Sequence, residues 1–119
     1  MPPPQWAKPK RGHSNFARRG HSNFALTRAC ARLTGLAILA SLKAALGDLD
    51  RVEAWLRVFG MVNAGKSFNR FPLVINGFSD LIAELYGPER GAHARSAVGM
   101  AGLPFDLPVE IEAEVAISG

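Results

Sequence analysis

The hydrophobic positions of this chain follow two periods, and the change between them marks the predicted elements. From Ala25 to Leu46, leucines and alanines recur at helical spacing and Gly47 supplies a stop, so we predict a helix. From Arg51 to Val62 the period is two, which predicts a strand. One face of that strand would carry Val52, Ala54, Leu56, Val58 and Val62, and the other Glu53, Trp55, Arg57, Phe59 and Met61. The aromatic second face indicates either a subunit contact or core packing.

The second half of the chain repeats this alternation. After a loop from Ala64 to Arg70, Pro72 suits the first turn of a helix that we expect to run to about Tyr86 and end at Gly87-Pro88. Its apolar face would be Val74, Phe78, Leu81, Ile82 and Leu85, with Asn76, Asp80 and Glu84 recurring every four residues on a polar face. Two strands follow, Arg95 to Ala101 and Leu107 to Ile117. This order predicts an α+β fold in which two helices cover one side of a sheet.

Residues 1–24 differ from the rest in composition. They contain several prolines, a basic run, and the sequence RGHSNFA at 11–17 and again at 19–25. We predict a disordered basic tail ahead of a domain over 25–119, with His13 and His21 as repeat copies and not a metal pair. The tail lacks the apolar core of a signal peptide. Because Arg32 and Lys43 interrupt the most apolar stretch, we predict no membrane span and a cytoplasmic protein.

The charge of +4 is unevenly distributed. Residues 1–32 carry seven bases and no acid, whereas residues 33–119 carry seven bases and all ten acids. A basic segment confined to a tail argues against nucleic acid as the specific ligand of the domain. The lone Cys30 excludes an internal disulfide, and we expect a buried helix residue there.

One motif matches a nucleotide-binding pattern. Gly60 to Ser67 reads GMVNAGKS, which satisfies the phosphate-loop consensus. A working phosphate loop opens directly into a helix, but the helix predicted here starts about five residues beyond Ser67. The chain also lacks alternating parallel strands. We therefore decline the nucleotide interpretation.

Four segments carry a resemblance to a known family. They are LKAALGDLDRV (42–52), GMVN (60–63), VINGFSDL (74–81) and HARSAVGMAGLP followed by VEIEAE (93–104 and 109–114). In order and spacing they resemble the reactive-intermediate deaminase (Rid) family, also labelled L-PSP endoribonucleases, which has a chorismate-mutase-like fold of the bacillary type. The resemblance runs from about Ala29 to Ile117. It implies a homotrimer and a pair of N-terminal strands, which are missing or replaced here; a replaced or misread gene start is one explanation.

The resemblance also implies a function and a site. Arg95 would bind the carboxylate of an α-imino acid or its enamine in a cleft between subunits, and Asn76 would line the cleft. Glu110 would be the second catalytic residue: it would help place the attacking water and accept its proton or pass one to the departing ammonia. No metal or organic cofactor is implied. The products would be an α-keto acid and ammonia. An arginine fork suits a carboxylate, since it binds both oxygens and stays charged.

Each of these residues also has a plain structural interpretation. Glu110, Glu112 and Glu114 alternate with apolar residues as on any half-buried strand, and a strand arginine is commonly a surface charge. His93 is expected to lead into a strand and not to act as a base. The alternative to an enzyme is a non-catalytic protein of the same fold that binds a small carboxylate, and ribonuclease activity is a third possibility that the acidic body disfavours.

Overall fold

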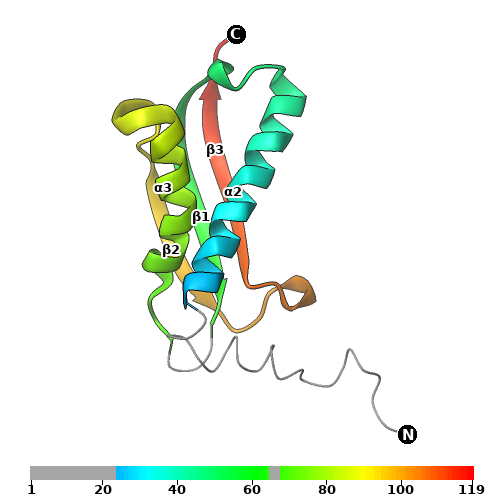
Figure 1. Ribbon diagram of the computed structural model, residues 1–119, viewed down its shortest axis with the longest axis vertical. Coiled ribbons are helices and arrows are strands. Elements are labelled where there is room, and N and C mark those ends of the chain that lie inside the picture. Colours follow the sequence, from blue (N-terminus) through cyan, green and yellow to red (C-terminus); the bar gives the residue numbers. More distant parts are fainter. Residues whose placement is uncertain (1–23, 65–67) are drawn as a thin grey trace, which may run out of the picture.

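The computed structural model describes residues 24–64 and 68–119. In chain order it contains helix α2 (Phe24–Leu46), the short helix η2 (Leu49–Arg51), strand β1 (Val52–Asn63), helix α3 (Phe71–Arg90), strand β2 (Ala94–Met100), the short helix η3 (Pro104–Asp106) and strand β3 (Val109–Ile117) (Figure 1). Both predicted helices and all three predicted strands are confirmed, with ends that shift by one or two residues except at α3.

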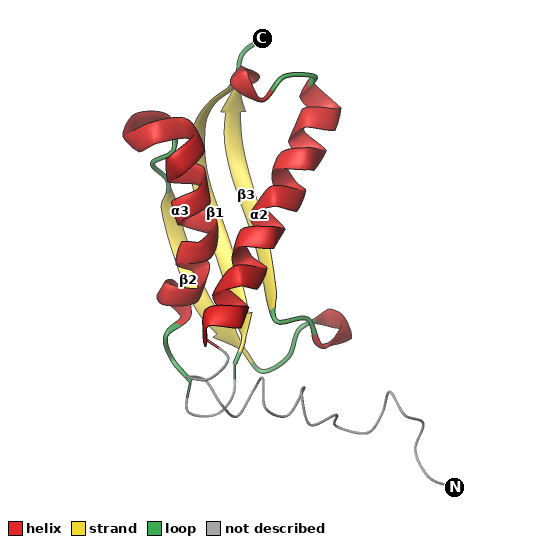
Figure 2. Ribbon diagram, viewed as in Figure 1, coloured by secondary structure: helices red, strands yellow, loops and turns green. Residues whose placement is uncertain are grey.

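The three strands form one mixed sheet in the order β2-β1-β3. Strand β1 runs parallel to β2 and antiparallel to β3. Helices α2 and α3 lie side by side on the same face of this sheet (Figure 2). A sheet that buries one face under two helices is the predicted α+β, chorismate-mutase-like architecture, which is thereby confirmed.

Strand β1 does not keep a strict period of two. Its register with β3 shifts between Val52 and Ala54 and again between Trp55 and Arg57. Each shift turns the following side chains toward the other face. As a result Trp55 is 1% exposed in the core, whereas Leu56 is 50% exposed. The prediction that placed Trp55 with Arg57 and Leu56 with Val58 is therefore wrong at these two positions. It is also wrong at Ala54, which pairs with Ala116 and so lies on the face opposite Val52.

The core lies between the sheet and the helices. Trp55 stands at its centre and makes edge-to-face contacts with Phe78 and Tyr86 of α3, at centroid distances of 5.9 and 5.8 Å. Such contacts between rings add to the stabilisation that burial alone provides. The largest fully buried side chains are Trp55, Phe78, Ile75, Ile82, Val52, Val58, Val62 and Val74.

Helix α3 extends beyond its predicted end. Gly87 breaks it with a φ of 78°, and a further turn that contains Pro88 continues to Arg90. Glycine adopts a positive φ without steric cost, and proline fits the first turn of a new helical segment because that position needs no N–H. The expected stop at Gly87-Pro88 is thus a kink, and it directs the chain toward the start of β2.

Helix α2 is long and apolar enough to meet the length and composition criteria for a membrane span. One such helix near the N-terminus is weak support for a span, because core helices of soluble proteins pass the same test. Here its residues Thr27, Ala31, Gly35 and Leu39 are buried at helical spacing. These residues form one stripe, as expected for a helix that packs on a protein core.

Two predictions fall outside the described residues. The disordered tail concerns 1–24, of which only Phe24, the first residue of α2, is described. Of the phosphate-loop match, residues 65–67 are also not described. What the structure does give is the start of α3 at Phe71, four residues after Ser67. That start agrees with the decision to decline the nucleotide interpretation, because the helix does not open directly from the motif.

Candidate functional site

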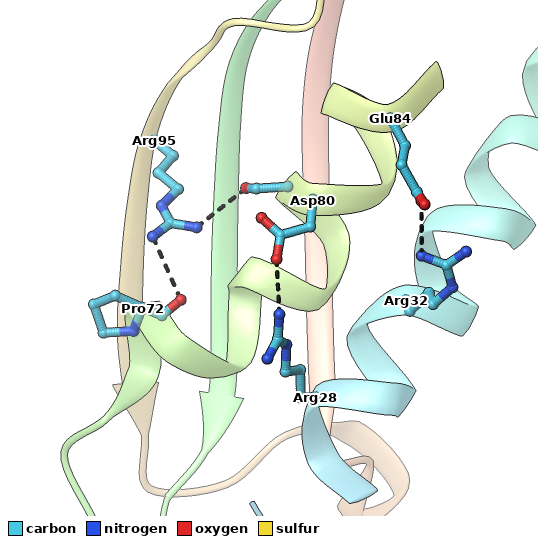
Figure 3. A network of polar contacts seen from close by, with 7 residues as sticks. Arg28, Arg32, Pro72, Asp80, Glu84 and Arg95 are labelled. Atoms are coloured by element: carbon cyan, nitrogen blue, oxygen red, sulfur yellow. Dashed lines mark hydrogen bonds and ion pairs between the residues drawn. The ribbon is translucent and has the colours of Figure 1, made fainter. Parts of the chain in front are cut away.

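Arg95 lies on the helix-covered side of the edge strand β2. It is paired in register with the buried Val58, and its side chain reaches over the flank of α3 (Figure 3). Nη1 donates a hydrogen bond to Ser79 Oγ at 3.1 Å, and Nη2 donates a longer one to the carbonyl oxygen of Pro72 at 3.4 Å. The guanidinium is therefore held against α3, half-buried, and does not extend into open solvent.

Ser79 connects Arg95 to His93. Ser79 Oγ lies 2.9 Å from His93 Nε2, and His93 Nδ1 lies 2.7 Å from the carbonyl oxygen of Gly91. A carbonyl only accepts hydrogen bonds, so Nδ1 must carry the proton, and Nε2 of the neutral ring is then the acceptor. The Ser79 hydroxyl consequently donates to His93 and accepts from Arg95.

The local structure fixes this series of contacts. His93 immediately precedes β2, and Arg95 is the second residue of that strand. Both side chains contact Ser79 of α3, so both point to the helix-covered side of the sheet. The ring of His93 also contacts the buried Phe78 edge-to-face at a centroid distance of 6.4 Å. Ser79, which follows Phe78 on α3, is thereby placed between the side chains of His93 and Arg95.

Asn76 lies on the same side of the fold as Arg95. It is half-buried on α3, four residues after Pro72 and three before Ser79. Residues at these spacings form one stripe along a helix. The two groups that hold Arg95 therefore flank Asn76 on that stripe, which brings two of the three predicted site residues to one surface.

Glu110 lies elsewhere in the chain. It is exposed on β3, paired with Met61 of β1, and the central strand separates it from β2. On β3 it alternates with Val109, which is buried under the helices, so the Glu110 side chain belongs to the uncovered face of the sheet. Within one chain, Arg95 and Glu110 are thus on opposite faces and on opposite edge strands.

A hollow of about 400 Å³ borders Glu110 between α2 and β3. Its lining is mostly apolar and consists of Cys30, Leu33, Thr34, Leu107, Pro108, Val109, Glu110 and Ile111. Cys30 is half-buried there, which is less than predicted, and its burial raises the pKa of the thiol. Arg95 does not line this hollow, so the hollow and the Arg95 surface are separate features of the chain.

Sequence analysis missed the participation of Ser79 and undervalued His93. The signal for His93 was its spacing of two from Arg95 before a predicted strand, which already implied a shared face. Ser79 gave no such signal. It sits in the middle of α3, and only the packing of α3 on β2 brings its hydroxyl to the two side chains.

Several known proteins are similar to this chain. Protein TCP17 of Trypanosoma cruzi is 45% identical over 91 residues, which cover 76% of this chain and 57% of that protein. The crystal structure of Atu1372, a protein of unknown function from Agrobacterium tumefaciens, superimposes with a TM-score of 0.76 at 46% identity and covers 80% of this chain and 61% of that one. No family model matches the sequence.

A third similar chain has a functional description. The crystal structure of a putative endoribonuclease from Shewanella oneidensis superimposes with a TM-score of 0.70 at 31% identity, covering 74% of this chain and 58% of that one. Its fold supports the resemblance to the L-PSP endoribonuclease-like proteins. This chain spans less than two thirds of the length of each of these three proteins.

Proposed function

We propose that this chain belongs to the Rid family and hydrolyses reactive α-imino acids, or their enamine tautomers, to α-keto acids and ammonia. The observation that carries the proposal is the anchored guanidinium of Arg95. The guanidinium has five N–H groups, and among the described residues two of them bond to Ser79 and Pro72, which leaves three that could bind a ligand. A half-buried fork with free donors is suited to a carboxylate.

The chemistry requires few groups. An imine conjugated to a carboxylate is already electrophilic, so holding the substrate and orienting a water molecule provide most of the catalysis. Arg95 would bind the substrate carboxylate, and the side-chain amide of Asn76 would bind a polar group of the substrate beside it. A cytoplasmic location is part of this proposal.

Glu110 enters the proposal only through a second copy of the chain. Because Glu110 and Arg95 face opposite sides of one sheet, Glu110 can meet Arg95 only when a neighbouring subunit supplies it. A homotrimer with its clefts between subunits would do so. The uncovered face of the sheet carries the half-buried apolar residues Phe59, Met61, Val98 and Met100, which would suit such a contact.

The alternative is a carboxylate-binding protein without catalysis. The same Arg95 contacts support it, because they provide binding and do not by themselves provide turnover. The description of the Shewanella protein raises ribonuclease activity as well. Against it stands the excess of acids over bases in residues 33–119, which disfavours a polyanionic substrate.

The test measures ammonia release from an α-imino acid generated in situ by an amino-acid oxidase. Arg95→Ala should reduce release to the uncatalysed rate and abolish pyruvate binding. Arg32→Ala, which removes an exposed arginine that pairs with Glu84, should leave both unchanged. Pyruvate binding without turnover would contradict the enzyme proposal and support the non-catalytic carboxylate-binding protein. Arg95-dependent cleavage of RNA, with no catalysed ammonia release, would contradict the deaminase proposal and support a ribonuclease.

A further inference from the structure

The contacts around Ser79 define a direction for proton movement. The hydroxyl has one donor and two acceptor positions. His93 Nε2 takes the donor, at 2.9 Å, and Arg95 Nη1 occupies one acceptor, at 3.1 Å. Within residues 24–64 and 68–119 no further contact to Oγ is seen, so one lone pair stays available next to the guanidinium that would bind the substrate. A water molecule that donates to this lone pair would be held beside a bound carboxylate.

His93 has the properties of the final proton acceptor. The Gly91 carbonyl fixes its tautomer and the Phe78 ring restricts its orientation, as the third group does in an arrangement of nucleophile, base and orienting partner. The lone pair on Nε2 can accept a proton, and the imidazolium that results can return it. Two carboxylates, Asp80 and Glu84, lie close to Ser79 in the sequence. They form ion pairs with Arg28 and Arg32 of α2, respectively.

We propose that Ser79 and His93 form the proton-transfer pair of the site centred on Arg95. This inference rests on the proposed deaminase function and assigns proton transfer to two groups of the same chain as Arg95. Glu110 of a neighbouring subunit would then place the water without accepting its proton.

The reaction balances with these groups alone. The water oxygen bonds to the carbon of the protonated imine, and the π electron pair of the C=N bond moves to nitrogen. The water proton passes to Ser79 Oγ while Ser79 gives its own proton to His93 Nε2. The imidazolium then returns a proton to the amino nitrogen of the carbinolamine. The C–N bond breaks, the hydroxyl proton leaves with the ammonia as ammonium, and the keto acid remains.

The primary experiment compares Ser79→Ala and His93→Gln with the wild-type protein. Glutamine retains an acceptor near the Nε2 position but does not titrate, so it separates orientation from proton transfer. Both variants should lower kcat about 100-fold, in the range of general acid–base catalysis, with the affinity for pyruvate changed less than about threefold.

Two controls accompany these variants. Ser41→Ala removes an exposed hydroxyl on α2, outside both the Arg95 surface and the uncovered face of the sheet, and should change nothing. Ser79→Thr keeps the hydroxyl and should recover most of the activity lost in Ser79→Ala. Circular dichroism would check that each variant folds.

The outcomes separate the inference from the function. If the wild-type protein is active and both Ser79→Ala and His93→Gln keep the wild-type rate, the proton-transfer role of Ser79 and His93 is wrong, whereas the deaminase function is unaffected. A wild type that binds pyruvate without releasing ammonia would overturn both. A measurement on the unmodified protein decides independently of the variants: ¹⁵N NMR of the His93 ring should show the proton on Nδ1. A proton on Nε2 would overturn the pair, since that nitrogen could not accept from Ser79.

Discussion

Gly77 of α3 lies directly beneath the main-chain carbonyl of Arg28 on α2. A Cβ atom built at Gly77 would overlap the Arg28 carbonyl oxygen, so the two helices approach each other through their backbones at this point. Two turns further along α2, Gly35 fits against Leu81 and Phe78 of α3. Absent side chains therefore set the distance between the helices, which also positions Ser79 and the stripe of α3 that faces Arg95.

Gly77→Ala should destabilise the fold. A backbone oxygen cannot move aside as a flexible side chain can, so we expect a loss of about 1 to 3 kcal/mol, despite the better helix propensity of alanine. Gly102→Ala is the matched control, since nothing lies within 4 Å of a Cβ there. Urea unfolding would measure both. Equal midpoints for the two variants would contradict the backbone contact.

Tyr86 should make the unfolding free energy depend on alkaline pH. Its hydroxyl donates to the Leu49 carbonyl at 2.8 Å, and burial raises the pKa of the phenol above its ordinary 10.0, with Arg90 opposing and Asp50 adding to the shift. Because the pKa is higher in the folded state, this contribution is complete below about pH 10 and is lost as the pH rises through the folded pKa.

The measurement is direct because the chain has one tyrosine. The phenolate absorbance of the folded protein should titrate above pH 10, and urea titrations should give a falling free energy of unfolding over the same interval. Tyr86→Phe should flatten that fall and cost about 1 kcal/mol at pH 7 through the lost hydrogen bond. A phenolate midpoint at or below that of the unfolded chain would exclude the raised pKa.

The ion pairs that join the helices should contribute little. Arg28 contacts Asp80 at 2.7 Å and Arg32 contacts Glu84 at 3.2 Å (Figure 3), but the side chains are 45 to 64% exposed. Exposed pairs are worth about 0.2 to 1 kcal/mol. A double-mutant cycle with Arg28→Ala and Asp80→Asn should give a coupling in that range, reduced further in about 1 M NaCl. A larger, salt-insensitive coupling would show that the pair is more shielded from water than its exposure indicates.

A mixing experiment tests whether Glu110 acts with Arg95 of another subunit. Arg95→Ala and Glu110→Gln should each lower ammonia release by at least about tenfold, and Glu112→Gln should serve as a control on the same face. If sites lie between subunits, randomly mixed oligomers should regain about a quarter of the wild-type activity, because that share of clefts receives both intact residues. No recovery from oligomers shown to have mixed would place Glu110 outside the Arg95 site.

Local pattern predicted the elements well where one face of an element is plainly apolar. The helical spacing in Phe24–Leu46 and the alternation of Val109, Ile111, Ala113 and Val115 with three glutamates both reappear in the structure. The pattern failed at Trp55, because a register shift in a strand leaves no trace in the types of residue that surround it. It also ended α3 too early, since a kink and a stop use the same residues, Gly87 and Pro88.

The candidate site divides in the same way. The sequence by itself determined the element types and the α+β class, because these depend on local periodicity. It also made Arg95 the leading candidate, because the order and spacing of four short segments carry the resemblance to the family. Only the tertiary structure decided that Arg95 meets Ser79 and that Glu110 lies on the opposite face. Those facts depend on strand order, register and the packing of α3 on β2, which bring together residues 14 to 23 positions apart and which no local pattern encodes.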